Sequence, residues 1–178
     1  MIRLFAAIAV PSSVVEVLAP LQQGLRGARW RPPEALHITL RFFGDIDERT
    51  ADDLDAELSA ITAAPFDVAL KGTGYFGEGK GMNAVWAGVE GNSALNNLAK
   101  RCEGAARQAG LKPEKRHYLP HLTLAYLRGA LEPDLAVWLQ ASSLLAIDPF
   151  AVDRFGLYSS WQGARQSSYR LEREYLLG

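Results

Sequence analysis

Hydrophobic and polar residues alternate with a period of two in a pair of stretches that share one motif. The stretches are Leu36-His37-Ile38-Thr39-Leu40 and Pro120-His121-Leu122-Thr123-Leu124. Such alternation is typical of a half-buried β-strand, in which residues two apart point to the same face. We therefore expect strands at about 36–43 and 121–128. In each strand the histidine projects beside its threonine, while the leucine and isoleucine side chains enter the core.

The rest of the chain alternates between strand patterns and helix patterns. Apolar runs predict strands at 2–10, 66–76, 82–89, 149–158 and 167–177. Apolar residues three and four apart predict a first helix, capped by Ser12 or Ser13 and ended by Gly24 and Gly27. They also predict further helices at about 48–61, 93–110 and 133–142. Residues 30–33 are expected to be irregular, Gly44-Asp45 to be a turn, and 77–81 to be a glycine-rich hairpin turn.

The order of these elements repeats along the chain. His37 precedes Pro65 by 28 residues, and His121 precedes Pro149 by the same number. Each half, approximately 1–80 and 82–178, reads strand, helix, histidine strand, helix, strand. The pattern predicts a single bilobal α+β domain with a duplicated fold. We expect this domain to have two mainly antiparallel sheets around a central cleft, with helices on the outer faces.

The amino-acid composition excludes several classes of protein. The chain has 178 residues, of which 48% are hydrophobic and 22% charged, as in an ordinary globular protein. A net charge of −1 excludes a strongly basic nucleic-acid coat protein. The single Cys102 excludes an internal disulfide framework and favours a reducing, cytoplasmic location. The apolar run at 4–10 is short for a signal peptide and far short of the ~20 residues that span a bilayer, so we expect no membrane contact.

The paired motif offers the groups needed for acid and base catalysis. Histidine titrates near neutral pH, so one of His37 and His121 can accept a proton while the other donates one. The hydroxyls of Thr39 and Thr123 can donate to an anionic oxygen. Arg41 has the strand parity of His37 and is expected to add a contact to a phosphate. Neither motif contains a cysteine or a carboxylate, so water or a substrate hydroxyl is the expected nucleophile.

The sequence predicts neither a metal site nor a cofactor. The third histidine, His117, lies in a charged loop and is expected to contact solvent. His117 and His121 have a spacing that suits one helical face, but Pro120 breaks a helix and no third ligand completes a zinc site. The glycine-rich turn at 77–81 has no following helix, so it is not expected to cradle a phosphate.

With these motifs the chain resembles the two-histidine (2H) phosphoesterases. Within that superfamily it is similar to the bacterial RNA 2′,3′-cyclic phosphodiesterases, historically called 2′-5′ RNA ligases. The resemblance covers nearly the whole chain and includes the two motifs, the opening Arg3-Leu4-Phe5 and the stretch at 152–160.

The resemblance implies an activity and a partner. It implies metal-free hydrolysis of a 2′,3′-cyclic phosphate at an RNA or oligonucleotide end, giving a 2′-phosphomonoester. His37 would protonate the leaving 3′ oxygen, His121 would activate water, and Thr39 and Thr123 would hold the phosphate oxygens. The reverse reaction would appear as weak 2′-5′ RNA ligase activity. We expect a monomer.

One position departs from the pattern of related proteins. They frequently carry an arginine five residues after the second motif histidine, where this chain has Tyr126, with Arg128 two residues later. The matching position in the first motif is Phe42, so an aromatic pair can hold a base by stacking. Simple alternation puts both aromatic residues opposite the histidines, and the stacking hypothesis therefore requires a bulge.

The sequence leaves two other functions open. The same chemistry can act on a cyclic nucleotide or on a nucleotide-sugar cyclic phosphate. An RNA-end-binding module without catalysis is the alternative from another class, although a pure binder needs no paired proton donor and acceptor.

Overall fold

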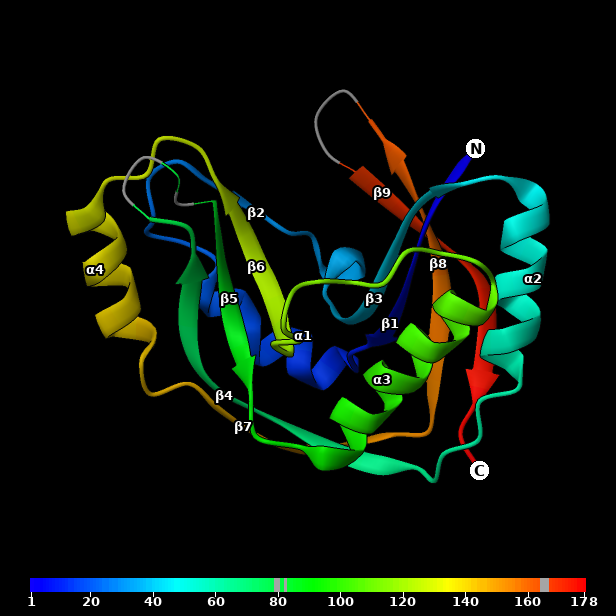
Figure 1. The fold of residues 1–178 in the computed structure, drawn as a ribbon. Coiled ribbons are helices and arrows are strands. Elements are labelled where there is room, and N and C mark those ends of the chain that lie inside the picture. The colour runs from blue at the N-terminus through cyan, green and yellow to red at the C-terminus, as the bar shows by residue number, and fades with distance from the viewer. Residues whose placement is uncertain (79–80, 82, 164–166) are drawn as a thin grey trace.

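The computed structural model describes residues 1–78, 81, 83–163 and 167–178. They form strands, helices and two short 3₁₀ turns (Figure 1). The strands are β1 (Ile2–Ala9), β2 (Ala28–Trp30), β3 (His37–Ile46), β4 (Phe66–Phe76), β5 (Ala84–Val89), β6 (His121–Leu127), β7 (Ala146–Val152), β8 (Arg154–Gln162) and β9 (Ser167–Leu176). The helices are α1 (Ser12–Leu18), α2 (Glu48–Ser59), α3 (Ser93–Gln108) and α4 (Glu132–Ser142), and the 3₁₀ turns are Ala19–Leu21 and Pro33–Ala35.

Most expected elements are present with ends shifted by a few residues. Both histidine strands, the first and last strands, β4, and the three later helices are confirmed. Local capping explains where two helices begin, because the side chains of Asp47 and Asn92 accept hydrogen bonds from the N–H groups of Thr50 and Leu95. The hairpin between β4 and β5 is also confirmed by their antiparallel pairing, while Gly79, Lys80 and Met82 lie outside the described residues.

The first helix differs from the prediction at both ends. Its N-cap is Pro11, with no side-chain hydrogen bond, so the expected serine cap is wrong. The helix ends at Leu18 and continues as a 3₁₀ turn, because Pro20 has no N–H for a helical hydrogen bond.

Trp30 and Gly44-Asp45, which were expected to lie outside the strands, belong to the sheet. Trp30 ends β2, which pairs with β6; a strand of three residues is too short to show a period. Gly44-Asp45 is not a turn, since β3 runs on to Ile46. Gly44 has a φ of 81° next to a register shift, so the strand bends at a bulge where a chain reversal was expected.

The strand expected at 149–158 is two strands. The chain leaves β7 at Val152 and enters β8 at Arg154, and the two strands lie in different parts of the sheet. Pro149 lies inside β7, which is an edge strand and can therefore tolerate a residue without an N–H.

The strands form one nine-stranded antiparallel sheet and not two separate sheets. The order is β7-β4-β5-β6-β3-β1-β8-β9, with β2 on β6. Two groups of strands meet at β6 and β3 through a single pair, Ile38 with Leu122. Neither group corresponds to one half of the sequence, because β4 pairs with β5 and β7, whereas β8 pairs with β1. Figure 1 shows α4 beside the β4–β5 side and α2 beside β8 and β9.

The strand register of the sheet agrees with the predicted repeat. The duplication of the two halves stays a prediction. Leu122 lies 84 residues after Ile38, the offset that also separates the two histidines. Ala151 pairs with Asp67 at the same offset. Antiparallel pairing of equivalent residues is what a twofold axis between two copies would produce.

Candidate active site

His37 begins β3 and His121 begins β6, the two strands through which the groups of strands meet. The two imidazole rings make equivalent hydrogen bonds. Nδ1 of His37 lies 2.9 Å from the carbonyl oxygen of Ala35, and Nδ1 of His121 lies 2.7 Å from that of Leu119. A carbonyl oxygen can only accept, so each Nδ1 carries the hydrogen. In each neutral ring Nε2 is therefore the basic nitrogen.

The two motifs lie on one face of the sheet, which we call the histidine face. Ile38 and Leu122 are buried and paired, so the neighbouring histidines and threonines project on the other side. Thr39 and Thr123 are half-buried there, each two residues from its histidine. Because the strands run antiparallel, His37 is level with Thr123 and His121 with Thr39 in the register of this pair.

Equivalent bulges bring both predicted aromatic residues onto the histidine face. In the pairing of β1 with β3, Ala7 faces Thr39 and Ala6 faces Arg41, so Leu40 is the extra residue. In the pairing of β5 with β6, the partners step from Thr123 to Ala125, so Leu124 is the extra residue. Each bulge inverts the alternation that follows it. Phe42 and Tyr126 therefore share a face with the histidines, and both remain about 45% exposed.

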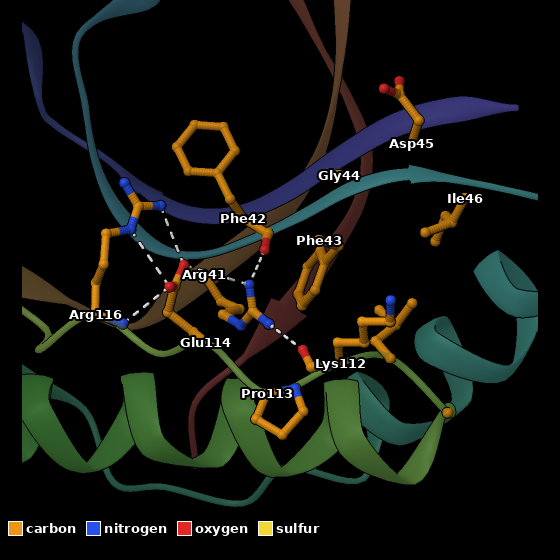
Figure 2. Close-up of a pocket in the computed structure, with 12 residues that line it drawn as sticks. Arg41, Phe42, Phe43, Gly44, Asp45, Ile46, Lys112, Pro113, Glu114 and Arg116 are labelled. Atoms are coloured by element: carbon orange, nitrogen blue, oxygen red, sulfur yellow. Dashed lines mark hydrogen bonds and ion pairs between the residues drawn. The ribbon is translucent and has the colours of Figure 1, made fainter.

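The Leu40 bulge sends Arg41 away from the histidines, so the parity argument for Arg41 was wrong. Its Nε lies 2.5 Å from Glu103 on α3, and its Nη2 donates to the carbonyl of Lys112 at 2.9 Å. Figure 2 shows Arg41 beside Lys112 and Glu114 in a pocket of about 540 Å³, which is lined by 41–46, by 110–114 and by Arg116. Neither histidine lines this pocket.

The remaining predicted residues lie outside the centre of the site. Arg128 is exposed just after β6, where its backbone N–H donates to the carbonyl of Gly27 at 2.9 Å. His117 is exposed, as expected.

Aromatic rings enclose each imidazole on the histidine face. The ring of His37 lies 5.0 Å from that of Phe5 and 5.2 Å from that of Tyr169. The ring of His121 lies 4.7 Å from that of Phe76, edge to face, and 6.2 Å from that of Trp86. These apolar surroundings withdraw both imidazoles from water.

Burial makes the charged form of both histidines unfavourable. It lowers the pKa of His37 to about 4, against the hydrogen bond to Ala35, and the charges of Arg31 and His121 lower it further. Burial also lowers the pKa of His121, against the hydrogen bond to Leu119. Both rings are therefore neutral at pH 7 and ready to accept a proton.

Sequence reasoning missed two polar neighbours of His37, namely Arg31 and Tyr169. The guanidinium carbon of Arg31 lies 5.0 Å from the ring centre of Tyr169 and 5.5 Å from that of Tyr126. Arg31 lies in a stretch without periodicity, and Tyr169 comes from the last strand, so no local pattern connects them. Within the described part of the chain, no three His, Cys, Asp or Glu side chains gather closely enough to hold a metal ion. Nor does any helix found there have the length and apolar character to cross a membrane.

A family model described as the 2'-5' RNA ligase superfamily matches residues 10–163, which include both histidine motifs. The chain belongs to this superfamily. The resemblance to the two-histidine phosphoesterases is thereby confirmed. As a member of the superfamily, the chain can be compared with relatives over most of its length.

Several relatives carry the name RNA 2',3'-cyclic phosphodiesterase. One from Thermotoga maritima is 30% identical over 166 residues, which are 89% of this chain and 86% of that protein. One from Archaeoglobus fulgidus is 31% identical over 129 residues, 71% and 73% of the two chains.

Solved structures share the fold. The protein TT0787 of Thermus thermophilus superposes with a TM-score of 0.81 at 25% identity, covering 98% of this chain and 97% of that one. The LigT protein of E. coli in complex with 3'-AMP has a TM-score of 0.79 at 24% identity, covering 99% and 98%. The expected combination of helices with antiparallel strands is thus confirmed, with one large sheet in place of the two that were expected.

Proposed function

We propose that this superfamily member hydrolyses 2′,3′-cyclic phosphate ends of RNA to 2′-phosphomonoesters. The observation that carries the proposal is the pair of imidazoles on one sheet face, each held through Nδ1 by the carbonyl two residues before it. This contact orients both rings and leaves both Nε2 atoms for proton transfer. The names of the relatives supply the substrate class.

In the proposed reaction the two histidines act together on opposite sides of the phosphorus. His121 takes a proton from water, which attacks phosphorus, while His37 protonates the 3′ oxygen as its bond to phosphorus breaks. The hydroxyls of Thr39 and Thr123 donate to the phosphate oxygens, on which charge develops. Since the side chains supply the acid, the base and the oxyanion donors, the reaction is proposed to need no metal.

His37 can start as the acid only if its pKa rises when the substrate binds. In the free protein burial and the charge of Arg31 keep it neutral. A phosphate anion beside the ring favours the imidazolium and offsets the charge of Arg31. Phe42 and Tyr126, exposed on the same face, are proposed to hold a base by stacking.

The proposal is tested with a dinucleotide that ends in a 2′,3′-cyclic phosphate. His37→Ala and His121→Ala should each lower kcat by about 10²-fold or more, because each removes one partner of the proton transfer. His117→Ala is the matched control and should act like the wild type. Products are separated by chromatography, with excess EDTA present throughout. Equal losses in all three variants, formation of a 3′-phosphate, or inactivity in EDTA would contradict the proposal.

The roles of the two histidines are tested with a substrate whose 3′ leaving atom is sulfur. A thiolate leaves readily without a proton, so the variant that lacks the acid should recover activity on this substrate. We expect rescue of His37→Ala alone. Rescue of His121→Ala alone would reverse the roles, and rescue of neither would mean that the histidines act mainly by binding the phosphate.

A further inference from the structure

Arg31 is a buried cation with an unused donor. Its side chain is buried, with the residue only 6% exposed, and Nη2 has no hydrogen-bond partner among the described residues. No ion pair to Arg31 is found among the residues that the structure describes. Burying a guanidinium donor without a partner costs free energy, because the donor gives up its hydrogen bonds to water. The arrangement therefore favours an anion as the missing partner.

The main chain of Arg31 is fixed to the strand that carries His121. Its N–H donates to the carbonyl of Leu124, the bulge residue of β6, at 2.8 Å. Nε2 of Gln22 donates to the carbonyl of Arg31 at 2.8 Å and to that of Leu124 at 3.2 Å. The guanidinium is thus anchored to a rigid part of the site.

Two tyrosine rings hold the guanidinium at the junction of the strand groups. Tyr126 belongs to β6 and Tyr169 to β9, which lie in different groups, and Arg31 contacts both rings. His37 packs on the same Tyr169 ring, at 5.2 Å between ring centres. An anion bound to Arg31 would therefore lie close to His37.

The other arginines named above are less suited to this role. Arg41 is bound to Glu103 on the opposite face of the strand. Arg128 is exposed, so water weakens its attraction for an anion.

We propose that Arg31 binds the phosphate of the substrate beside His37, with its guanidinium held against the ring of Tyr169 while the ring of Tyr126 moves aside. The inference rests on the proposed function, since it names a substrate-binding residue of the same site. The planar guanidinium can donate two hydrogen bonds to a phosphate, which fixes the orientation of the anion as well as its position. Nη2 is covered in the free protein, so binding requires the half-exposed Tyr126 ring to swing outward.

The test measures binding and does not depend on turnover. Inorganic phosphate, 2′-AMP and uncharged adenosine are titrated calorimetrically into the wild type, Arg31→Met, Arg31→Gln and Arg101→Met. Arg101 is an exposed residue of α3, so its variant is the control for loss of one charge. Both Arg31 variants should bind phosphate and 2′-AMP about tenfold or more weakly, with adenosine binding unchanged. Wild-type phosphate affinity in either folded Arg31 variant would overturn the proposal.

In a second measurement the phosphate titration uses the wild-type protein, so the result does not depend on whether a variant folds. The Nε signal of Arg31 in the ¹⁵N spectrum of the wild type is assigned by its absence in Arg31→Lys. It should shift when phosphate is added and not when adenosine is added; no shift with phosphate would overturn the proposal. Tyr126→Ala should bind phosphate at least as well as the wild type, and a loss there would assign the contact to the tyrosine hydroxyl.

The two proposals can fail separately. If phosphate binding depends on Arg31 but no cyclic phosphate is hydrolysed, the phosphate site stands and the proposed reaction fails. If hydrolysis proceeds and phosphate binding is indifferent to Arg31, the reaction stands and this inference fails.

Discussion

At the scale of single residues, His37 and His121 have the same local contact and different charge environments. Both donate from Nδ1 to a carbonyl two residues back, and both are half-buried against aromatic rings. In the part of the chain that the structure describes, a guanidinium adds to the effect of burial on the pKa of His37 and not on that of His121. This difference gives the two motifs unlike proton affinities, although their sequences are almost identical.

The lowered pKa of His37 predicts how stability depends on pH. The folded protein binds this proton with a pKa of about 4 and the unfolded chain with one near 6.5, so the unfolded chain takes up more protons between these values. The contribution is fully present above pH 6.5 and is lost as the pH falls toward 4. The wild type should lose on the order of 1 kcal/mol per pH unit in this window relative to His37→Gln. Urea unfolding at several pH values measures this, and parallel curves for the two proteins would contradict it.

At the scale of elements, the bulges in β3 and β6 determine what shares a face with the histidines. Each bulge adds one residue between the threonine and the aromatic position, so Phe42 and Tyr126 join the site and Arg41 leaves it. Close packing of β5 against β4 also constrains the strand beside His121. Gly88 pairs with His121, and a Cβ there would lie 2.6 Å from the backbone oxygen of Lys71.

This close approach predicts opposite effects for two glycine substitutions. Gly88→Ala should destabilise the protein by about 1–3 kcal/mol, because β4 and β5 must separate, and should lower kcat by displacing His121. Gly104→Ala is the control, since Gly104 lies within α3 with no neighbouring atom within 4 Å of a Cβ. It should stabilise by about 0.5–1 kcal/mol without changing kcat. Chemical denaturation and steady-state kinetics measure both, and a stable, fully active Gly88→Ala would show that β5 adapts.

At the scale of the whole molecule, the site lies where two groups of strands meet. The groups are joined through one residue pair between β3 and β6 and by contacts such as the hydrogen bond from the Tyr118 hydroxyl to the carbonyl of Thr39. Arg31 and Tyr169 also approach the site from different groups. The net charge of the chain is only −1, so we expect the proposed binding of RNA to depend on this local site more than on a broad basic surface.

This charge balance predicts a weak salt dependence for RNA substrates. Each phosphate held in a single strand contributes a slope of about −0.7 to a plot of log affinity against log salt. One or two phosphates at the site predict a slope of about −0.7 to −1.4, with little gain in affinity for longer RNA. The KM of a dinucleotide and of a longer oligonucleotide, each ending in a cyclic phosphate, is measured over a range of salt. A slope of about −4 would instead indicate a long electrostatic interface.

The sequence by itself determined most helices and strands, among them both histidine strands, the family, and the placement of each threonine beside its histidine. These features depend on alternation over a few residues, and local geometry dictates them. The sequence also named Phe42 and Tyr126, together with the bulge that each would need. It could not place the bulges, because an extra residue is visible only against the neighbouring strand.

Only the tertiary structure decided which charges face the histidines. It paired Arg41 with Glu103 on α3. It also placed Tyr169, from the last strand, beside both His37 and Arg31, which lies six residues before His37. It also divided the strands into groups that cross the halves of the sequence. The physical reason is the same in each case. The pairing of distant strands and the burial of a charge depend on contacts between segments that share no local pattern.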